Sequence, residues 1–235
     1  MRWLFGFPGA GAGPAVFPDW KDKLAPQLQF EEIYWNSGIR RPGEYIDRME
    51  DAAELCARRI SSLVSEGDEI FLFGHCLGAN AAYETAVLLA RSYDCSIQGL
   101  FVSAATSPDV PIEEGISGWD EEAFAKHIES HHTFPQEFFE KPALRKFFLP
   151  KLRADYRMIE TYCDSRHAVL DCPIGGFFGD ADETVPPEET AGWASYTNRG
   201  FTLQYFPGDH YFYYDHQDEI IDMMKRMSAQ FEEAA

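Results

Sequence analysis

A short segment of this sequence has the residues expected of a sharp turn that holds a nucleophilic side chain. Residues 74–78 are Gly-His-Cys-Leu-Gly, and they lie between the apolar run 70–73 and the helix-favouring run 79–84. A strand that turns sharply into a helix needs small residues on both sides of the nucleophile, because the backbone there is tight and strained. The thiol of Cys76 is therefore the candidate nucleophile, and we expect the neighbouring His75 to point away from it. The alternative is that Cys76 is only a small buried apolar residue.

A nucleophile of this kind requires a base, and the base requires an acid that orients it. His210 follows the last apolar strand candidate, and Asp182 follows the strand candidate before it. The order nucleophile, acid, base is that of α/β-hydrolases. Asp182 is preferred because it lies farther into its loop, and Asp180 and Asp109 remain as alternatives. Weaker candidates for the base lie near a helical insertion or at the start of the last helix: His127, His131, His132, His167 and His216.

Acyl transfer also needs hydrogen-bond donors for the negative charge that develops on the substrate oxygen. The glycine-rich loop at 7–13, Phe-Pro-Gly-Ala-Gly-Ala-Gly, can bring backbone N–H groups close to a substrate. We assign the two donors to the backbone N–H groups of Ala10 and Leu77. A phosphate cradle is the competing interpretation, but the loop lacks the GxGxxG pattern, the chain is acidic, and Pro8 removes a donor.

The elements that must hold these residues alternate along the chain. Short apolar runs at 3–7, 28–34, 69–73, 99–104, 173–178 and 201–206 alternate with helical stretches at 45–64, 79–93, 187–195 and 216–231. This alternation is typical of a mostly parallel central sheet with helices on both faces. We therefore predict the α/β class, with the α/β-hydrolase fold, as a single domain over residues 1–235.

One region departs from the alternation. Between about 106 and 165 no strand pattern occurs, and the helical segments 121–130 and 142–148 follow one another. We predict a helical lid over approximately 107–165, which would cover a cleft and exclude water from it. Its aromatic side chains either line an acyl pocket or pack the lid onto the body: Phe134, Phe138, Phe139, Phe147 and Phe148.

Composition narrows the classes of partner and compartment. The 235 residues carry a formal net charge of −19, which repels phosphate and makes a nucleic-acid partner unexpected. No apolar run reaches the roughly 18 residues of a membrane span. The first residues lack the pattern of a signal peptide, so we expect a cytoplasmic protein with no membrane association. Five scattered cysteines without a CxxC pair predict reduced thiols and no metal site.

Several of these segments together resemble type II thioesterases, the free-standing editing hydrolases of nonribosomal peptide and polyketide assembly lines. The resemblance covers nearly the whole chain, and its segments are 7–12, 74–78, 147–162, 179–182, Trp193 and 206–210. It implies that Cys76, Asp182 and His210 are nucleophile, acid and base. It also implies that the substrates are acyl or aminoacyl thioesters on the phosphopantetheine arm of a carrier protein, that no other cofactor is needed, and that the protein is a monomer.

The carrier protein implied by the resemblance gives a cationic stretch a possible role. Residues 141–157 contain six cations and one acid, Asp155. Because carrier proteins are typically acidic, Lys146, Lys151 and Arg153 are candidates for a docking patch. The alternative, a solvated helical face, remains equally open.

Two positions depart from the family pattern. Residues 36–41 replace a usual Pro-Gly-Arg segment, and Cys76 stands where the family has serine. A cysteine acyl-enzyme is itself a thioester, so acylation is readily reversible and the intermediate reacts well with thiols and amines. The first hypothesis is therefore thioester hydrolysis, and the alternative is an acyl or aminoacyl transferase or cyclase. A third hypothesis is a degenerate hydrolase that only binds carrier proteins.

Overall fold

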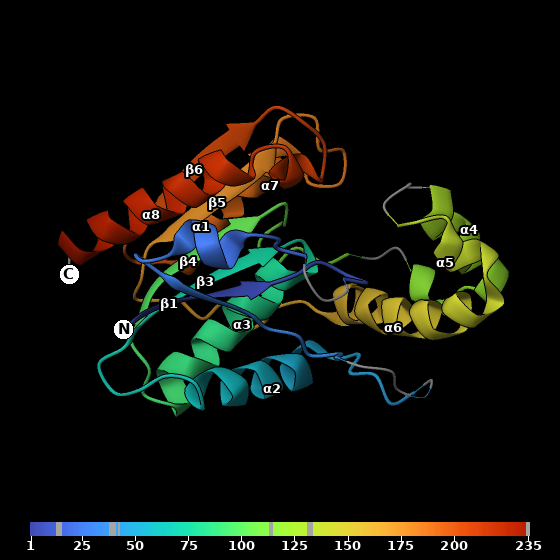
Figure 1. Ribbon diagram of the computed structural model, residues 1–235, viewed down its shortest axis with the longest axis horizontal. Helices are drawn as coiled ribbons and strands as arrows, with labels where there is room; N and C mark the ends of the chain where they lie inside the picture. Colours follow the sequence, from blue (N-terminus) through green and yellow to red (C-terminus); the bar gives the residue numbers. More distant parts are fainter. Residues whose placement is uncertain (13–15, 38–40, 42, 113–114, 131–133, 234–235) are drawn as a thin grey trace.

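A six-stranded parallel sheet forms the centre of the fold (Figure 1). The structure is a computed structural model that describes residues 1–235 except 13–15, 38–40, 42, 113–114, 131–133 and 234–235, and leaves the side chains of 188 and 231–233 undescribed. The strand order is β2-β1-β3-β4-β5-β6, and every neighbouring pair is parallel. This confirms the predicted α/β sheet. The strands are β1 (Arg2–Phe7), β2 (Gln29–Glu32), β3 (Glu69–His75), β4 (Ile97–Ser103), β5 (Ile174–Gly179) and β6 (Phe201–Phe206).

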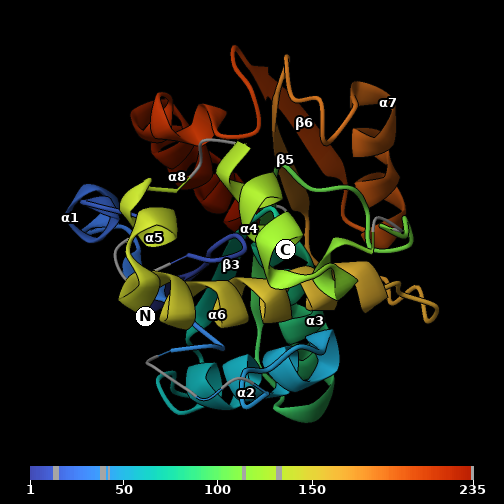
Figure 2. The ribbon, with the colours of Figure 1, turned by 90° about the vertical axis from the view of Figure 1, so that its right-hand side faces the viewer.

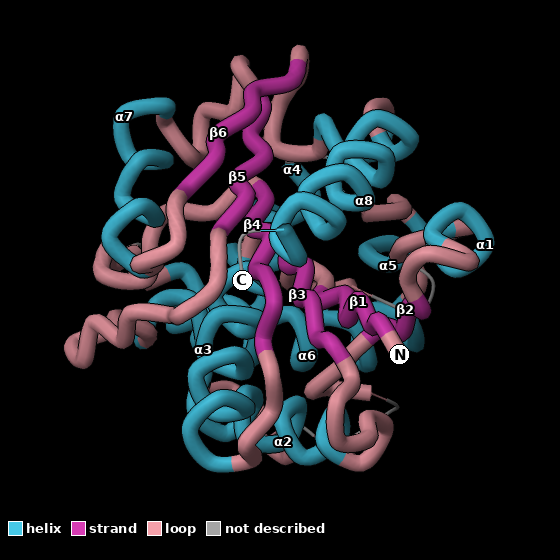
Figure 3. The backbone as a smooth tube through the Cα atoms, turned by 90° about the vertical axis from the view of Figure 1, so that its left-hand side faces the viewer, coloured by secondary structure: helices cyan, strands magenta, loops and turns pink. Residues whose placement is uncertain are grey.

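Helices cover both faces of the sheet, because successive side chains of a strand point to opposite faces. In β3, Ile70 and Leu72 join one hydrophobic cluster, whereas Phe71 and Phe73 join the other. The first cluster is shared with two long helices and the second with two others, on the opposite face (Figure 3). The helices of the first face are α2 (Met49–Ser61) and α3 (Leu77–Ser92), and those of the second are α1 (Trp20–Leu24) and α8 (Gln217–Glu233).

The strand order changes direction between β1 and β3. The chain passes from β1 to β2 on one side and then returns to β3 on the other side of β1. Ligands of open parallel sheets bind at the carboxyl ends of the strands where the order reverses, because the loops there diverge and leave a crevice. Phe7 and Gly74 are register partners at these two strand ends. The loop after β1 and the turn after β3 therefore lie side by side.

A helical insertion lies at the carboxyl edge of the sheet (Figures 1 and 2). It consists of η1 (Ile116–Gly118), α4 (Glu121–Ser130), α5 (Glu137–Glu140) and α6 (Pro142–Thr161), between β4 and β5. It has a small core of its own, which includes Phe124 and Leu152. Among the described residues between β4 and β5, only Leu170 makes a strand-like contact, an isolated bridge.

The aromatic side chains of the insertion mostly pack against each other. The ring of Phe148 lies 4.8 Å from those of Phe134 and Phe138 and 5.9 Å from that of Phe139, between centroids. Phe147 is 45% exposed on the outer surface. These contacts favour the interpretation in which the aromatics pack the lid, and Phe134 also faces the glycine-rich loop, as described below.

Element boundaries differ from the prediction at several places; for example, the helix expected over 45–64 is confined to Met49–Ser61. The helix expected to end at 148 continues to Thr161 through Pro150, because buried Leu149 and Leu152 hold the helix in spite of the missing N–H. The five-residue α1, too short to show a helical period, was not expected. The helix expected over 187–195 divides into α7 (Pro187–Thr190) and the 3₁₀ helix η2 (Ala191–Tyr196).

Candidate active site

Cys76 occupies a strained turn between β3 and α3. Its backbone has φ 55° and ψ −125°, a conformation that side-chain-bearing residues rarely adopt. A Cβ at Gly74 would lie 2.2 Å from the carbonyl oxygen of Gly78, and a Cβ at Gly78 would lie 2.1 Å from that of Phe7. Both glycines are therefore required for the close approach of backbone segments. Strain of this kind persists only where the surrounding structure enforces it, which is common at functional sites.

The predicted acid and base lie in contact. Asp182 Oδ2 is 2.8 Å from His210 Nδ1, and the Asp182 side chain is completely buried. The other oxygen, Oδ1, accepts hydrogen bonds from Thr184 N at 2.9 Å, Thr184 Oγ1 at 2.6 Å and Val185 N at 3.2 Å. These donors fix the carboxylate so that it faces the imidazole. The Asp182 pKa is lowered: burial acts to raise it, but the bond with His210 and the bonds from Thr184 outweigh burial.

The two alternative acids lie elsewhere. Asp180 is exposed, and its carboxylate accepts the Gly208 N–H at 3.0 Å. Asp109 interacts with Tyr196. Of the remaining histidines, His127 contacts the Trp119 ring edge to face, and His167 and His216 contact backbone carbonyls. His131 and His132 lie outside the described residues.

Cys76 and His210 perturb each other strongly. Burial acts to raise the Cys76 pKa, but the charge of His210 and the hydrogen bonds from His210 and the Leu77 N–H outweigh it and lower the pKa. Burial likewise acts to lower the pKa of His210, but Cys76 and Asp182 outweigh it and raise the pKa. Both directions favour a thiolate–imidazolium pair. Such a pair gives a cysteine its nucleophilicity near neutral pH.

His75 is buried and packs beside the candidate base. Its ring lies 5.3 Å from the His210 ring and 4.3 Å from the Tyr213 ring. Its Nδ1 lies 3.0 Å from Ser103 Oγ. Burial, aided by the nearby charge of His210, holds the His75 pKa well below its usual range. The neutral ring of His75 therefore packs against the His210 ring as an uncharged neighbour. The sequence did not reveal this contact, because it depends on how the loop after β6 folds back.

Thr184 was also not singled out from the sequence. Its hydroxyl donates to Asp182 Oδ1 and lies 2.8 Å from His210 Nδ1. A local signal for the first contact exists. Aspartate side chains often accept hydrogen bonds from residues two positions later, as Asp182 does from the backbone of Thr184.

The glycine-rich loop approaches the nucleophile closely. A Cβ at Gly9 would lie 3.5 Å from Cys76 Cβ. Ala12 N donates to Gly9 O at 3.3 Å, which closes a turn over residues 9–12. In the described part of the chain the Ala10 N–H has no hydrogen-bond acceptor, whereas the Leu77 N–H is directed at the Cys76 thiol. Of the two predicted oxyanion donors, Leu77 is the first residue of α3, directly after Cys76, and Ala10 follows Gly9 in the loop after β1. Gly13 lies outside the described residues.

The three candidate docking cations have different surroundings. Lys151 Nζ donates to the Ala12 carbonyl, and burial lowers its pKa. Arg153 donates to the carbonyls of Ser117 at 2.5 Å and Trp119 at 2.6 Å and lies over the Phe124 ring. Lys146 is exposed and has no ion-pair partner among the residues whose placement is described. Lys151 and Arg153 thus bind backbone carbonyls, whereas Lys146 is the one of these three candidates with neither a hydrogen-bond acceptor nor an ion-pair partner among the described residues.

Within the described ranges, no group of three or more His, Cys, Asp or Glu side chains could hold a metal ion. None of the described helices is both long and apolar enough to cross a membrane. Of the segment 36–41 that departs from the family pattern, residues 38–40 lie outside the described ranges.

Comparisons with known proteins identify similar sequences and similar folds. The thioesterase PikA5 of Streptomyces venezuelae is 30% identical over 214 residues, which is 91% of this chain and 76% of the relative. The gramicidin S biosynthesis protein GrsT of Aneurinibacillus migulanus is 26% identical, with 94% and 86% covered. Among solved structures, the type II thioesterase BorB from the borrelidin biosynthetic cluster has a TM-score of 0.84 and 25% identity, with 97% of this chain and 93% of BorB covered. ClbQ from the colibactin pathway has a TM-score of 0.87 and 25% identity, with 100% and 99% covered. The family model described as "Thioesterase domain" matches residues 2–227, and the chain therefore belongs to this family of thioester hydrolases.

Proposed function

We propose that this thioesterase releases acyl or aminoacyl groups from the phosphopantetheine arm of a carrier protein in nonribosomal peptide or polyketide biosynthesis, through an acyl-enzyme on Cys76. The observation that carries the proposal is the position of Cys76 in the strained turn, paired with a His210 that Asp182 contacts at 2.8 Å. The relatives named for thioesterase activity or antibiotic biosynthesis support the pathway.

The chemistry follows from the paired charges. The Cys76 thiolate attacks the thioester carbonyl, and the N–H groups of Ala10 and Leu77 stabilise the oxyanion. The bond between the carbonyl carbon and the pantetheine sulfur then breaks, and the sulfur leaves with the proton of His210. In the second half, His210 removes a proton from water, the hydroxide adds to the acyl group, and the Cys76 thiolate is released. Asp182 holds the imidazole and stabilises its charged form throughout.

Acyl transfer to a second carrier thiol or to an amine is the second candidate, and the identity of Cys76 favours it. The acyl-enzyme is a thioester of nearly the same energy as the substrate. The acyl group can therefore pass to another thiol with little loss of free energy. Replacement of cysteine by serine would change this balance, because an oxygen ester lies lower in energy than a thioester.

The experiment gives the enzyme a loaded carrier with and without a second, unloaded carrier, and follows all species by mass spectrometry. Hydrolysis predicts free acid at equal rates in both mixtures, and an acyl adduct on the Cys76 peptide that disappears in Cys76→Ala. If acyl groups appear on the second carrier and little free acid forms, the reaction is acyl transfer and not hydrolysis. Cys76→Ser should still acylate but should transfer poorly to thiols.

Carrier docking is tested through Lys146, which lies near exposed Leu144 and Phe147 on α6. Lys146→Glu should raise KM for an acidic carrier substrate severalfold and leave a small N-acetylcysteamine thioester unaffected, and added salt should reduce the difference. Arg91→Glu is the matched control, because Arg91 is an exposed cation at the opposite end of α3 from Cys76. Equal KM values for Lys146→Glu and the unmodified enzyme would mean that α6 is not part of the docking surface.

A further inference from the structure

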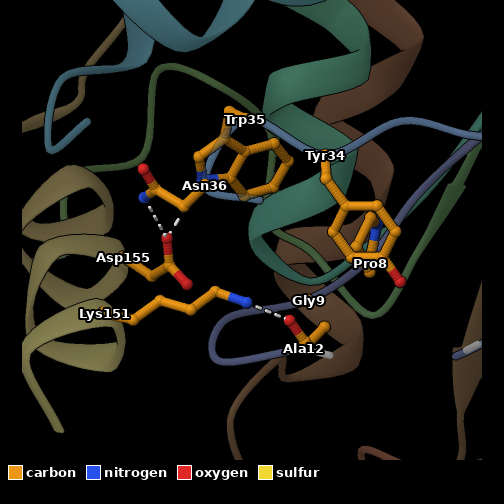
Figure 4. Close-up of a pocket in the computed structure, with 8 residues that line it drawn as sticks. All are labelled: Pro8, Gly9, Ala12, Tyr34, Trp35, Asn36, Lys151 and Asp155. Carbon is orange, nitrogen blue, oxygen red and sulfur yellow. Dashed lines mark hydrogen bonds between the residues drawn. The ribbon is translucent and has the colours of Figure 1, made fainter. Parts of the chain in front are cut away.

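The lid helix α6 carries a buried carboxylate that the proposed reaction does not use. Asp155 is only 2% exposed, yet its two oxygens accept hydrogen bonds from three groups of the body. Oδ2 accepts the Gly11 N–H at 2.9 Å, and Oδ1 accepts Trp35 Nε1 at 3.0 Å and Asn36 Nδ2 at 3.3 Å. Figure 4 shows Asp155 and Lys151 of α6 at a small pocket, which is also lined by residues of the loops after β1 and after β2.

The Gly11 contact falls within the turn that follows β1. Gly11 is the third residue of the turn 9–12, and its φ of +72° is one that glycine adopts without strain. A Cβ at Gly11 would lie 2.6 Å from Leu152 Cδ1 and 2.8 Å from a carbon of Phe134, so the turn packs directly on the lid. The Lys151 ammonium, one helical turn from Asp155, donates to the carbonyl of Ala12. Two side chains of α6 thus hold the turn from the lid side.

The remaining face of the turn is directed at the nucleophile. A Cβ at Gly9 would lie 3.5 Å from Cys76 Cβ, and Ala10 lies between Gly9 and Gly11, the residue that Asp155 holds. We propose that Asp155 is a positioning residue that fixes the turn 9–12 and so aims the Ala10 N–H at the thioester carbonyl. The oxyanion site is then complete only when α6 is seated on the body. This inference rests on the proposed function, because it assigns the oxyanion to Ala10.

Burial of a carboxyl group is unfavourable unless its oxygens are hydrogen-bonded. Burial alone raises the Asp155 pKa, and the bonds from Gly11, Trp35 and Asn36 together with the charge of Lys151 only partly offset it. A well-packed apolar residue at such a position is often as stabilising as a buried charge. An apolar residue cannot, however, orient a peptide N–H. The geometry of the turn is therefore the benefit that this carboxylate supplies.

The test is Asp155→Asn. Donors face both carboxylate oxygens, so the new amide NH₂ must oppose either the Gly11 N–H or the Trp35 and Asn36 donors. Loss of a direct oxyanion donor lowers kcat by about 10²–10³. Misorientation of Ala10 should lower it by roughly 10- to 100-fold, with KM changed less than about twofold, because the contact forms in the transition state.

A second readout separates positioning from general damage. Alkylation of Cys76 by iodoacetamide develops no oxyanion, so its rate in Asp155→Asn should equal that of the unmodified enzyme. Trp35→Phe removes one donor but keeps an aromatic ring at this position, and it should show a smaller fall of kcat with the same unchanged alkylation. An unchanged kcat in both variants, or equal losses of kcat and alkylation, overturns the proposal.

A buried carboxylate that does not contact the turn serves as the control. Asp164, which follows α6, accepts hydrogen bonds from Tyr83 Oη and Arg166 N, each at 2.9 Å. Asp164→Asn should lower Tm while kcat stays within about twofold. If Cys76 of the unmodified enzyme is alkylated no faster than exposed Cys163, the proposed nucleophile fails instead, whatever Asp155→Asn does.

Discussion

Asp182→Asn should disable the enzyme by forcing the wrong tautomer on His210. Asp182 Oδ1 accepts bonds from two backbone N–H groups and the Thr184 hydroxyl, so the carbonyl oxygen of an asparagine must occupy this position. The amide NH₂ then takes the place of Oδ2, 2.8 Å from His210 Nδ1, and donates to it. The imidazole proton must move to Nε2. In this form Nε2 cannot accept the proton of Cys76.

The size of the effect has an upper and a lower bound. The same exchange in a serine triad lowers kcat by about 10⁴. A cysteine is already a few per cent thiolate near neutral pH, which reduces its dependence on the base. We therefore expect kcat/KM to fall by about 10²–10⁴. At 1.36 kcal/mol per tenfold change this is about 3–5 kcal/mol of transition-state stabilisation.

The assay measures kcat/KM for an N-acetylcysteamine thioester, with Tm recorded for each variant. Asp180→Asn is the matched control, because it changes the same charge two residues away, at a side chain that contacts the Gly208 N–H and not His210. It should retain at least about a third of the activity. The tautomer argument is refuted if Asp180→Asn is the more damaging change, or if folded Asp182→Asn keeps more than a tenth of the activity.

Two further predictions concern the pKa values of two thiols and the effect of a side chain at two glycines with positive φ. The rate of alkylation should reach its plateau at a lower pH for Cys76 than for Cys95, because His210 outweighs burial and lowers the Cys76 pKa, whereas burial raises that of Cys95. Peptide mass spectrometry across pH 5–10 measures both, and a Cys76 profile at or above that of Cys95 contradicts the ion pair. Gly67→Ala, at φ +82° with open space around it, should lower Tm by about 2–4 °C from backbone strain of about 1 kcal/mol. Gly11→Ala should lower Tm further and reduce kcat, since its Cβ would meet Leu152; equal Tm values for the two variants would contradict the contact with the lid.

The sequence predicted those features that depend on local pattern. The strands have period-two or continuous apolar runs, and the glycines at 74 and 78 mark a turn that only small residues allow. The existence of the helical insertion also followed from the absence of strand patterns. The length of α6 did not, because Pro150 favours a helix end and only the burial of Leu152 and Met158 explains its continuation.

Apart from the contact between Asp182 and His210, the contacts between distant segments could not be predicted. Lys151 and Arg153 have the composition of a docking patch, but their partners are backbone carbonyls 139 and 36 residues away along the chain. His75 packs against the loop after β6, and Asp155 binds Gly11, which is 144 residues distant. No short-range pattern encodes such pairs, because they arise when the insertion and the loops meet at one edge of the sheet.

The helix α6 belongs to two cores at once. Leu149 and Leu152 pack in the core of the insertion, whereas Met158 packs in the core of the body. The insertion therefore cannot swing away as one rigid flap without breaking this helix or exposing Met158. A chimera with another family member should accept a foreign segment over 116–148, whose contacts are largely within the insertion. A graft that extends through 162 also replaces Met158 and its contacts with the core of the body, so the boundary for remodelling substrate range lies within α6 and not at its ends.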